Sequence, residues 1–227
     1  MYKDLEVLGK EKFKDIKFDT VDVAEVGKSI GLVPVGFLEV TDMGSIVPVV
    51  IMGGENEMEF IGLFSLSNEM SVFNKQSLLN PLYLRTYPFV NVRAKAEDDT
   101  VSNVIGIDVN SECVGEDKTV SIFDDKGELT NEANAKVEMV RELNRQRDIS
   151  KNIIKALKDN DLLIEKDFKI KAGEEEKTIL ENFYMVDREK LYALDDALLL
   201  EWAKKGWLTL IDCHIKSLRN FVNLVTQ

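Results

Sequence analysis

Residues 131–160 have the sequence NEANAKVEMV RELNRQRDIS KNIIKALKDN, and this stretch decides the fold. Its apolar side chains recur at helical spacing, which predicts one long helix, and Thr130 before it is a plausible N-cap. The apolar positions are Ala133, Val137, Val140, Leu143, Ile149, Ile153 and Leu157. Gln146 and Arg147 interrupt this stripe, and half-buried polar groups need partners. We expect those partners near Arg85 or His214.

Upstream of this helix, the chain is rich in strand and turn signals. Apolar, partly β-branched segments predict strands at residues 33–38, 46–52, 60–66, 101–109 and 119–123. Gly53-Gly54 lies between two of these segments and predicts a hairpin. Residues 21–30 predict a short helix that ends at Gly31. Asn80-Pro81 favours a helical turn, and Pro88 favours extended backbone after it.

Downstream, a second hairpin is predicted from residues 162–171 and 177–186 with a turn at Gly173. Asp187 and either Asp195 or Asp196 are in position to cap two helices, and the second of these helices should stop near Gly206. A last amphipathic helix begins at Trp207. Its apolar face contains Trp207, Ile211, His214, Ile215, Leu218 and Val222.

Together these patterns predict an α+β fold. Residues 1–125 are expected to be mostly β, and residues 126–227 mostly α with a β-hairpin. We expect a single domain over residues 1–227, with a strand-rich N-terminal half, the long central helix, the hairpin and the C-terminal helices around one core. A chain of 227 residues is long enough for such a core.

Charge and composition restrict the classes of function. The chain has 29 Lys and Arg against 41 Asp and Glu, a net charge of -12. Such a field repels phosphate backbones, so no nucleic-acid partner is expected. No apolar run is long enough to span a bilayer, and the first residues do not resemble a signal peptide. We expect a cytoplasmic protein, or one that reaches the cell surface without a classical signal peptide. The two cysteines, Cys113 and Cys213, are expected to be reduced.

Several chemical signatures are absent from the sequence. The chain has one histidine, no C-x-x-C pair, no phosphate-binding glycine loop and no G-x-S-x-G elbow. Residues 124–127 lack the alternating oxygen ligands of a calcium loop and predict a turn. We therefore predict no catalytic residues, no metal and no cofactor.

His214 is the most conspicuous polar residue, with Asp212, Cys213 and Ser217 around it. Residues one or two positions apart on a helix do not face each other, so only Ser217 could reach the imidazole within this helix. A catalytic pair would also need an orienting group from elsewhere. His214 is either a satisfied core residue or a ligand or acid–base group, and both interpretations stay open.

A second candidate is the segment Tyr83-Leu84-Arg85-Thr86-Tyr87-Pro88-Phe89. The fork of an arginine binds carboxylates or phosphates, and tyrosines can line such a pocket. The alternative is that Arg85 pairs with a carboxylate inside the fold.

Four stretches of the chain resemble the SapC family of bacterial proteins. They are residues 83–89, residues 123–128 before the long helix with Gln146, residues 182–200, and residues 206–220. The order and spacing agree from about Pro34 to Asn220. The family is named after a gene at a surface-layer locus, and the resemblance implies no established enzymatic activity. The sequence departs from the family pattern at Asp212-Cys213.

Three functions remain open. The first is a non-catalytic, surface-layer-associated protein of this family, acting through an unknown protein partner such as a surface-layer or export component. The second is an enzyme or small-molecule binder with an anion-binding cleft around Arg85, Gln146 and His214. The third is a regulatory or assembly protein in the cytosol. The residues predicted for binding are Tyr83, Arg85, Tyr87, Gln146, Tyr184, His214, Ser217 and Asn220.

Overall fold

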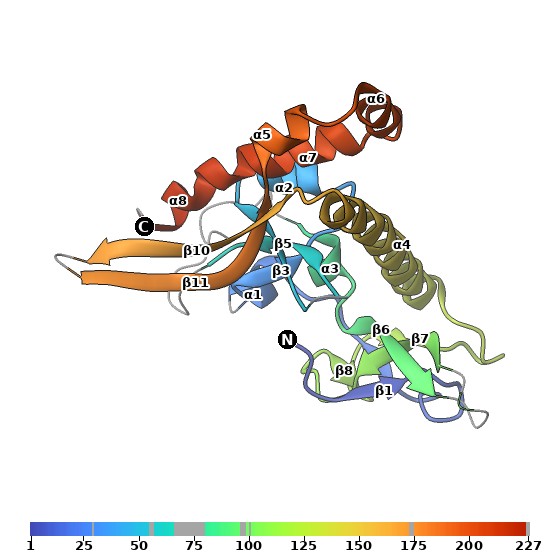
Figure 1. Ribbon diagram of the computed structural model, residues 1–227. Coiled ribbons are helices and arrows are strands. Elements are labelled where there is room, and N and C mark those ends of the chain that lie inside the picture. The colour runs from blue at the N-terminus through green and yellow to red at the C-terminus, as the bar shows by residue number, and fades with distance from the viewer. Residues whose placement is uncertain are drawn as a thin grey trace. The chain divides into compact units, whose positions relative to one another are not determined.

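The computed structural model describes residues 1–28, 30–54, 57–65, 80–95, 99, 101–172 and 175–225 (Figure 1). The chain divides into two compact units, each built from two segments. Unit 1 contains Met1–Val26 and Leu82–Arg145, and unit 2 contains Gly27–Pro81 and Gln146–Gln227. Helix α4 (Asn131–Asp159) contributes residues to both. Helices combined with antiparallel sheets confirm the predicted α+β class. A single domain over residues 1–227 stays a prediction.

Unit 1 contains two small antiparallel sheets. The first has the strand order β1 (Leu5–Val7), β7 (Val101–Asp108), β6 (Phe89–Lys95), and the second β8 (Val114–Gly115), β2 (Lys17–Phe18), β9 (Val120–Ser121). The short helix α3 (Leu82–Arg85) precedes β6. The predicted turn after β9 is confirmed, because Gly127 N–H donates to the Asp124 carbonyl (2.8 Å) with Gly127 at φ 77°.

The core of unit 1 is formed by aromatic and aliphatic side chains from both sheets and from the first half of α4. These are Phe13, Phe18, Phe89, Ile107, Ile122, Ala133, Val137 and Val140. The rings of Phe18 and Phe89 meet edge to face at 5.1 Å. Thr130 caps α4 as predicted, since its Oγ1 accepts from Ala133 N–H at 3.3 Å. The helical periodicity of residues 133–140 therefore corresponds to a face that is buried in this core.

Unit 2 is organised around one antiparallel sheet of five strands. The strand order is β10 (Leu163–Ala172), β11 (Glu175–Val186), β4 (Val49–Met52), β5 (Glu59–Leu63), β3 (Leu32–Pro34). Both predicted strand pairings are confirmed, β4 with β5 and β10 with β11, whereas the predicted turn at Gly173 lies outside the described residues. Figure 1 shows the strands β10 and β11 running on together beyond the shorter strands of this sheet.

Short helices complete unit 2. They are α2 (Val40–Gly44), α5 (Arg188–Tyr192), α6 (Asp196–Lys204), α7 (Trp207–Ser217), the 3₁₀ turn η2 (Leu218–Asn220) and α8 (Phe221–Val225). Helix α1 (Val23–Lys28) contributes residues to both units. Asp187 caps α5 and Asp195 caps α6 with side-chain hydrogen bonds, as predicted. Gly206, at φ 74°, separates α6 from α7. No described helix is both long and apolar enough to cross a membrane.

Two predictions are wrong in detail. Residues 33–38 are not one strand, because β3 ends at Pro34 and the chain turns where Glu39 N–H donates to the Gly36 carbonyl (2.9 Å). Val222 is not on the buried face, since its side chain is 56% exposed. The 3₁₀ turn η2 changes the helical phase after Ser217, so that Asn220 and Leu224 take the inward positions instead.

Candidate functional site

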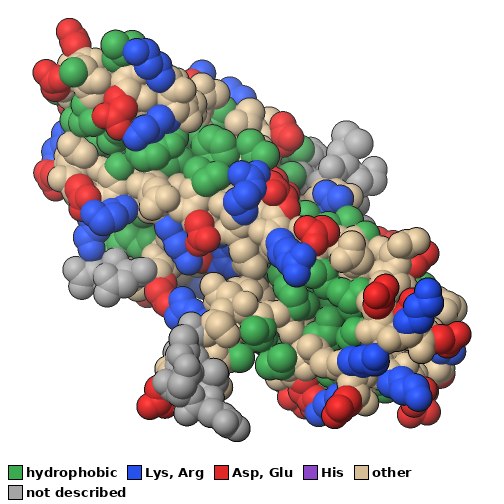
Figure 2. Space-filling view, turned by 90° about the vertical axis from the view of Figure 1, so that its right-hand side faces the viewer, with side chains coloured by type: hydrophobic (Ala, Val, Ile, Leu, Met, Phe, Trp, Pro, Cys, Tyr) green, Lys and Arg blue, Asp and Glu red, His purple; other side chains and the backbone are tan. Residues whose placement is uncertain are grey.

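Helix α7 and the following turn place three predicted residues in a row on one face. His214, Ser217 and Asn220 are spaced three residues apart and are 0%, 0% and 6% exposed. Residues three apart lie on the same side of a helix, so the whole row faces residues 44–49 of unit 2. We call these three side chains the polar row. No histidine is visible on the face drawn in Figure 2, where acidic and basic side chains are interspersed.

Both nitrogens of His214 are used by strand backbone. Nδ1 lies 2.7 Å from the Val49 carbonyl oxygen, and Nε2 accepts the N–H of Val186 at 3.2 Å. This pairing requires the proton on Nδ1, so the tautomer follows from the partners. Burial lowers the pKa of His214 to about 4, and the hydrogen bond to Val49 opposes this only in part. The imidazole is therefore neutral at pH 7.

Ser217 and Asn220, the other members of the polar row, also form hydrogen bonds with backbone atoms. Ser217 Oγ accepts the N–H of Val49 at 2.9 Å and donates to the backbone carbonyl of His214 at 2.6 Å. The hydroxyl thus bonds to the backbone of His214 and not to its ring. Asn220 Nδ2 donates to the carbonyl of Gly44 at 2.9 Å. The polar row satisfies backbone groups that α7 would otherwise bury without partners.

Gln146 and Arg147, which interrupt the apolar stripe of α4, contact other parts of unit 2. Gln146 is buried, and its Oε1 accepts the N–H of Leu38 at 3.2 Å. Arg147 pairs with Glu59 at 2.5 Å, where both side chains are less than one third exposed. These contacts account for two polar residues in a largely buried stripe.

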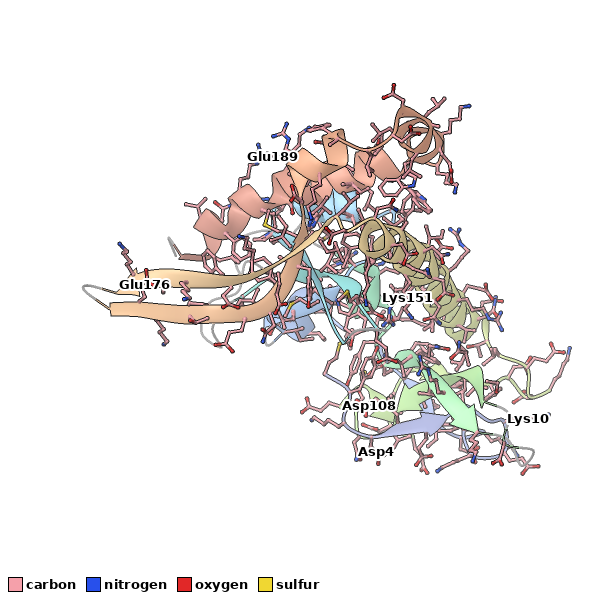
Figure 3. All side chains as sticks on the ribbon, in the orientation of Figure 1. Asp4, Lys10, Asp108, Lys151, Glu176 and Glu189 are labelled. Carbon is pink, nitrogen blue, oxygen red and sulfur yellow. The ribbon has the colours of Figure 1, made fainter. Side chains whose placement is uncertain are left out.

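Tyr184 lies on β11, and its hydroxyl donates to Glu165 at 3.2 Å. The same residue borders a shallow cavity of about 400 Å³. The cavity is lined by Gly53, Met58, Lys158, Asp161, Leu163 and Tyr184. A second hollow of about 340 Å³ shares Met58 and Lys158 with it and extends along α4 to Lys151, which Figure 3 labels.

The predicted tyrosines of unit 1 pack around the N-terminus. The ring of Tyr2 lies 6.1 Å from that of Tyr83 and 5.5 Å from that of Tyr87. Tyr87 donates to the buried carboxylate of Asp108 (3.3 Å), which also accepts the N–H of Asp4 at 3.0 Å (Figure 3). Burial raises the pKa of Tyr2 and of Tyr87, so both phenols stay protonated near neutral pH.

Arg85 is placed differently from the other predicted residues. Its side chain is half-buried, and in the part of the chain that the structure describes its guanidinium forms no ion pair or hydrogen bond. Its carbonyl accepts from Nζ of Lys136 at 2.6 Å, and Tyr87 supplies a second carbonyl to the same amine at 3.3 Å. Burial, with a smaller contribution from the charge of Arg85, lowers the pKa of Lys136. Arg85 and Lys136 thus form a pair of cationic side chains in unit 1.

The residues brought together therefore form separate groups. His214, Ser217 and Asn220 meet on one face of unit 2, whereas Tyr83, Arg85 and Tyr87 belong to unit 1. Tyr2, Asp108 and Lys136 are absent from the sequence-based prediction. The burial of Lys136 could have been predicted from the sequence, because it lies three residues after Ala133 on the buried side of α4.

The remaining candidates for chemistry are the two cysteines and any cluster of metal-ligand side chains. Cys113 and Cys213 are both free thiols, and burial raises the pKa of Cys113. Across the described residues, no three His, Cys, Asp or Glu side chains are grouped so that they could hold a metal ion.

Comparison with known proteins supplies a family. No curated protein and no solved structure gives a significant match to this chain. The family model SapC matches residues 8–224, which is nearly the full length and includes the polar row, Gln146, Tyr184 and the segment around Arg85. The chain belongs to the SapC family.

Proposed function

We propose that this is a non-catalytic bacterial protein of the SapC family that acts by binding a protein partner, in association with a surface layer or an export system. One observation carries the proposal: the only imidazole of the chain has both nitrogens committed to the backbone of Val49 and Val186. The residue best suited for acid–base chemistry holds the sheet and helix α7 together instead.

General acid–base catalysis requires a group that can reach the substrate and change its protonation state near the working pH. His214 is fully buried, and burial lowers its pKa to about 4. Ser217 has no imidazole beside its hydroxyl to activate it, because its partners are backbone atoms. These facts favour a structural role for the polar row in a protein that functions by binding.

The partner and its compartment are tested in source cells. Intact cells are treated with protease and probed with antibody beside a lysed control, and parallel cells are cross-linked before lysis. We expect surface accessibility and a discrete cross-linked species that contains a surface-layer or export component. A chain that is protected in intact cells and cross-links to no such component would contradict the proposal.

A second candidate is anion binding at Arg85. It is favoured by the guanidinium of Arg85, which forms no ion pair or hydrogen bond within the described residues, and by the amine of Lys136 and the rings of Tyr83 and Tyr87 in the same unit. Arginine binds carboxylates and phosphates in a two-pronged geometry. In the sequence-based version of this site Gln146 and His214 supply polar contacts, and both have backbone partners in unit 2.

Calorimetric titration with inorganic phosphate and with acetate tests this second candidate. Binding to the wild type should disappear in Arg85→Gln and persist in Arg141→Gln, a matched control whose arginine is exposed and already paired with Glu138. Equal titration curves for all three proteins would exclude an anion site at Arg85.

A further inference from the structure

Strand β10 is one edge of the five-stranded sheet of unit 2. Among the described strands, β11 is its only partner, and side chains along it are exposed on the surface. The exposed residues are Glu165, Lys166, Asp167, Lys169 and Lys171. A ten-residue edge strand offers a row of backbone donors and acceptors for another strand to pair with.

The ladder between β10 and β11 contains two register shifts. The register with β11 shifts between Lys166 and Phe168 and again between Phe168 and Lys169. At each shift the partner strand skips one residue more than β10 does, as the pairs Phe168–Leu180 and Lys169–Thr178 illustrate. The extra residues therefore lie in β11, and the outer edge of β10 remains a continuous template.

The charges of β10 change sign at its midpoint. The strand has the sequence Glu165-Lys166-Asp167-Phe168-Lys169-Ile170-Lys171. If a second copy of β10 is laid antiparallel with Phe168 opposite Phe168, Glu165 faces Lys171 of the second copy and Asp167 faces Lys169 of the second copy. Two-fold symmetry repeats both pairs, so four oppositely charged pairs form on one face. Phe168 and its symmetry mate meet on the other face.

Neighbouring registers are less favourable. Centring the two-fold axis on Asp167 places that carboxylate opposite itself, and centring it on Lys169 does the same with the ammonium group. Like charges opposite each other across two strands are destabilising. The charges on β10 therefore disfavour pairing in general, as on many edge strands, but permit one self-complementary register.

The opposite edge of the sheet lacks these properties. Strand β3 has three residues and ends at Pro34, which has no N–H to donate. Phe168 is also held in place from within unit 2, since its ring stacks on Phe221 at 4.3 Å. The residue at the proposed symmetry axis is thus already ordered before any second copy arrives.

We propose that two copies of this chain associate through antiparallel pairing of β10 with β10, centred on Phe168, so that the two five-stranded sheets become one continuous sheet. The interface is isologous, because each copy presents the same strand to the other. The proposal concerns self-association and does not depend on the partner-binding role.

Two charge variants of the full-length protein test the pairing. Glu165→Lys with Asp167→Lys makes the edge basic, and Lys169→Glu with Lys171→Glu makes it acidic. Analytical ultracentrifugation should show a wild-type dimer and two monomeric variants, with the dissociation constant raised at least about tenfold in each variant. An equimolar mixture of the two variants should restore a dimer that contains one copy of each, because every facing pair is then opposite in sign.

Controls separate this result from a general charge effect. Lys14→Glu with Lys126→Glu changes the net charge as the acidic variant does, but on exposed positions of unit 1, and should leave the dimer intact. Circular dichroism checks that each variant is folded. The salt dependence of the wild-type dimer is a further test, since added salt should weaken pairing between opposite charges. A wild type that is monomeric at every concentration, or a dimer that tolerates both charge variants, would overturn the proposal.

Discussion

His214 occupies the position of a ladder hydrogen bond between Val49 and Val186. Strands β11 and β4 pair at Tyr184 and Ile51, so continued antiparallel register would set Val186 opposite Val49. The imidazole accepts the Val186 N–H at 3.2 Å and lies 2.7 Å from the Val49 carbonyl oxygen. One side chain therefore bridges β11 and β4 at this position, and it simultaneously attaches α7 to the sheet.

This arrangement makes stability depend on pH. The folded state holds His214 neutral down to a pKa of about 4, whereas in the unfolded chain the pKa is about 6.5. Above pH 6.5 both states are neutral and the stabilisation is fully present. As pH falls from 6.5 toward 4, only the unfolded state gains the proton, and the protein should lose about 2.5 kcal/mol by pH 4.5.

The variant His214→Gln isolates this contribution, because carboxylates titrate alike in both proteins. Urea unfolding at pH 7 and at pH 4.5 should show a larger loss of unfolding free energy for the wild type than for the variant. Parallel pH dependences in the two proteins would mean that His214 is not held neutral by burial.

Ser217→Ala should destabilise the protein by about 1–3 kcal/mol. The substitution leaves the buried N–H of Val49 without its acceptor, which lies at 2.9 Å in the wild type. Thr209→Ala is the matched control, because Thr209 lies on the same helix α7 but is exposed. Chemical denaturation of the three proteins measures the difference, and equal costs at both positions would argue against the proposed role of Ser217.

The sequence predicted those elements whose signals are local. The periodicity of α4, the two strand pairings and the caps Asp187 and Asp195 all depend on nearby residues, and the structure confirms them. The helical phase changes at η2, where Asn220 donates to Gly44, 176 residues away. No local pattern contains that information, so periodicity alone places Val222 on the wrong face.

For the candidate site, too, local sequence patterns do not reveal contacts between residues that are far apart in the chain. Helix spacing correctly left Asp212 and Cys213 out of reach of His214, but it suggested Ser217 as a partner of the ring. The ring instead contacts Val49 and Val186, which lie 165 and 28 residues away. Side chains that satisfy distant backbone have the same appearance in a sequence as side chains that bind ligands.

The cap of α5 provides a quantitative test of a residue in the family resemblance. Asp187 accepts the N–H groups of Glu189 and Lys190 at 3.0 and 3.1 Å. Asp187→Ala should therefore cost about 1 kcal/mol, and Asp187→Asn should recover most of it. Thermal unfolding of both variants measures this, with Asp196→Ala as a control in the first turn of α6. If the asparagine variant is no better than the alanine variant, capping does not explain the residue.

Gly36 is required by its close approach to Gln146. A Cβ at position 36 would lie 2.4 Å from Oε1 and 2.9 Å from Cβ of Gln146. Gly36→Ala should displace this side chain from its hydrogen bond with Leu38 and destabilise the protein by about 1–3 kcal/mol. Gly54→Ala, where a Cβ would meet no described atom within 4 Å, should be nearly neutral.

A double-mutant cycle identifies the contact that is responsible. In a Gln146→Ala background the amide is gone, so adding Gly36→Ala should cost less than it does in the wild type. Guanidinium unfolding of the four proteins gives the coupling. If Gly36→Ala costs the same in both backgrounds, the requirement for glycine comes from the turn at residues 36–39 and not from Gln146. The expected positive coupling would show that the polar interruption of α4 is held in place by a residue 110 positions earlier in the chain.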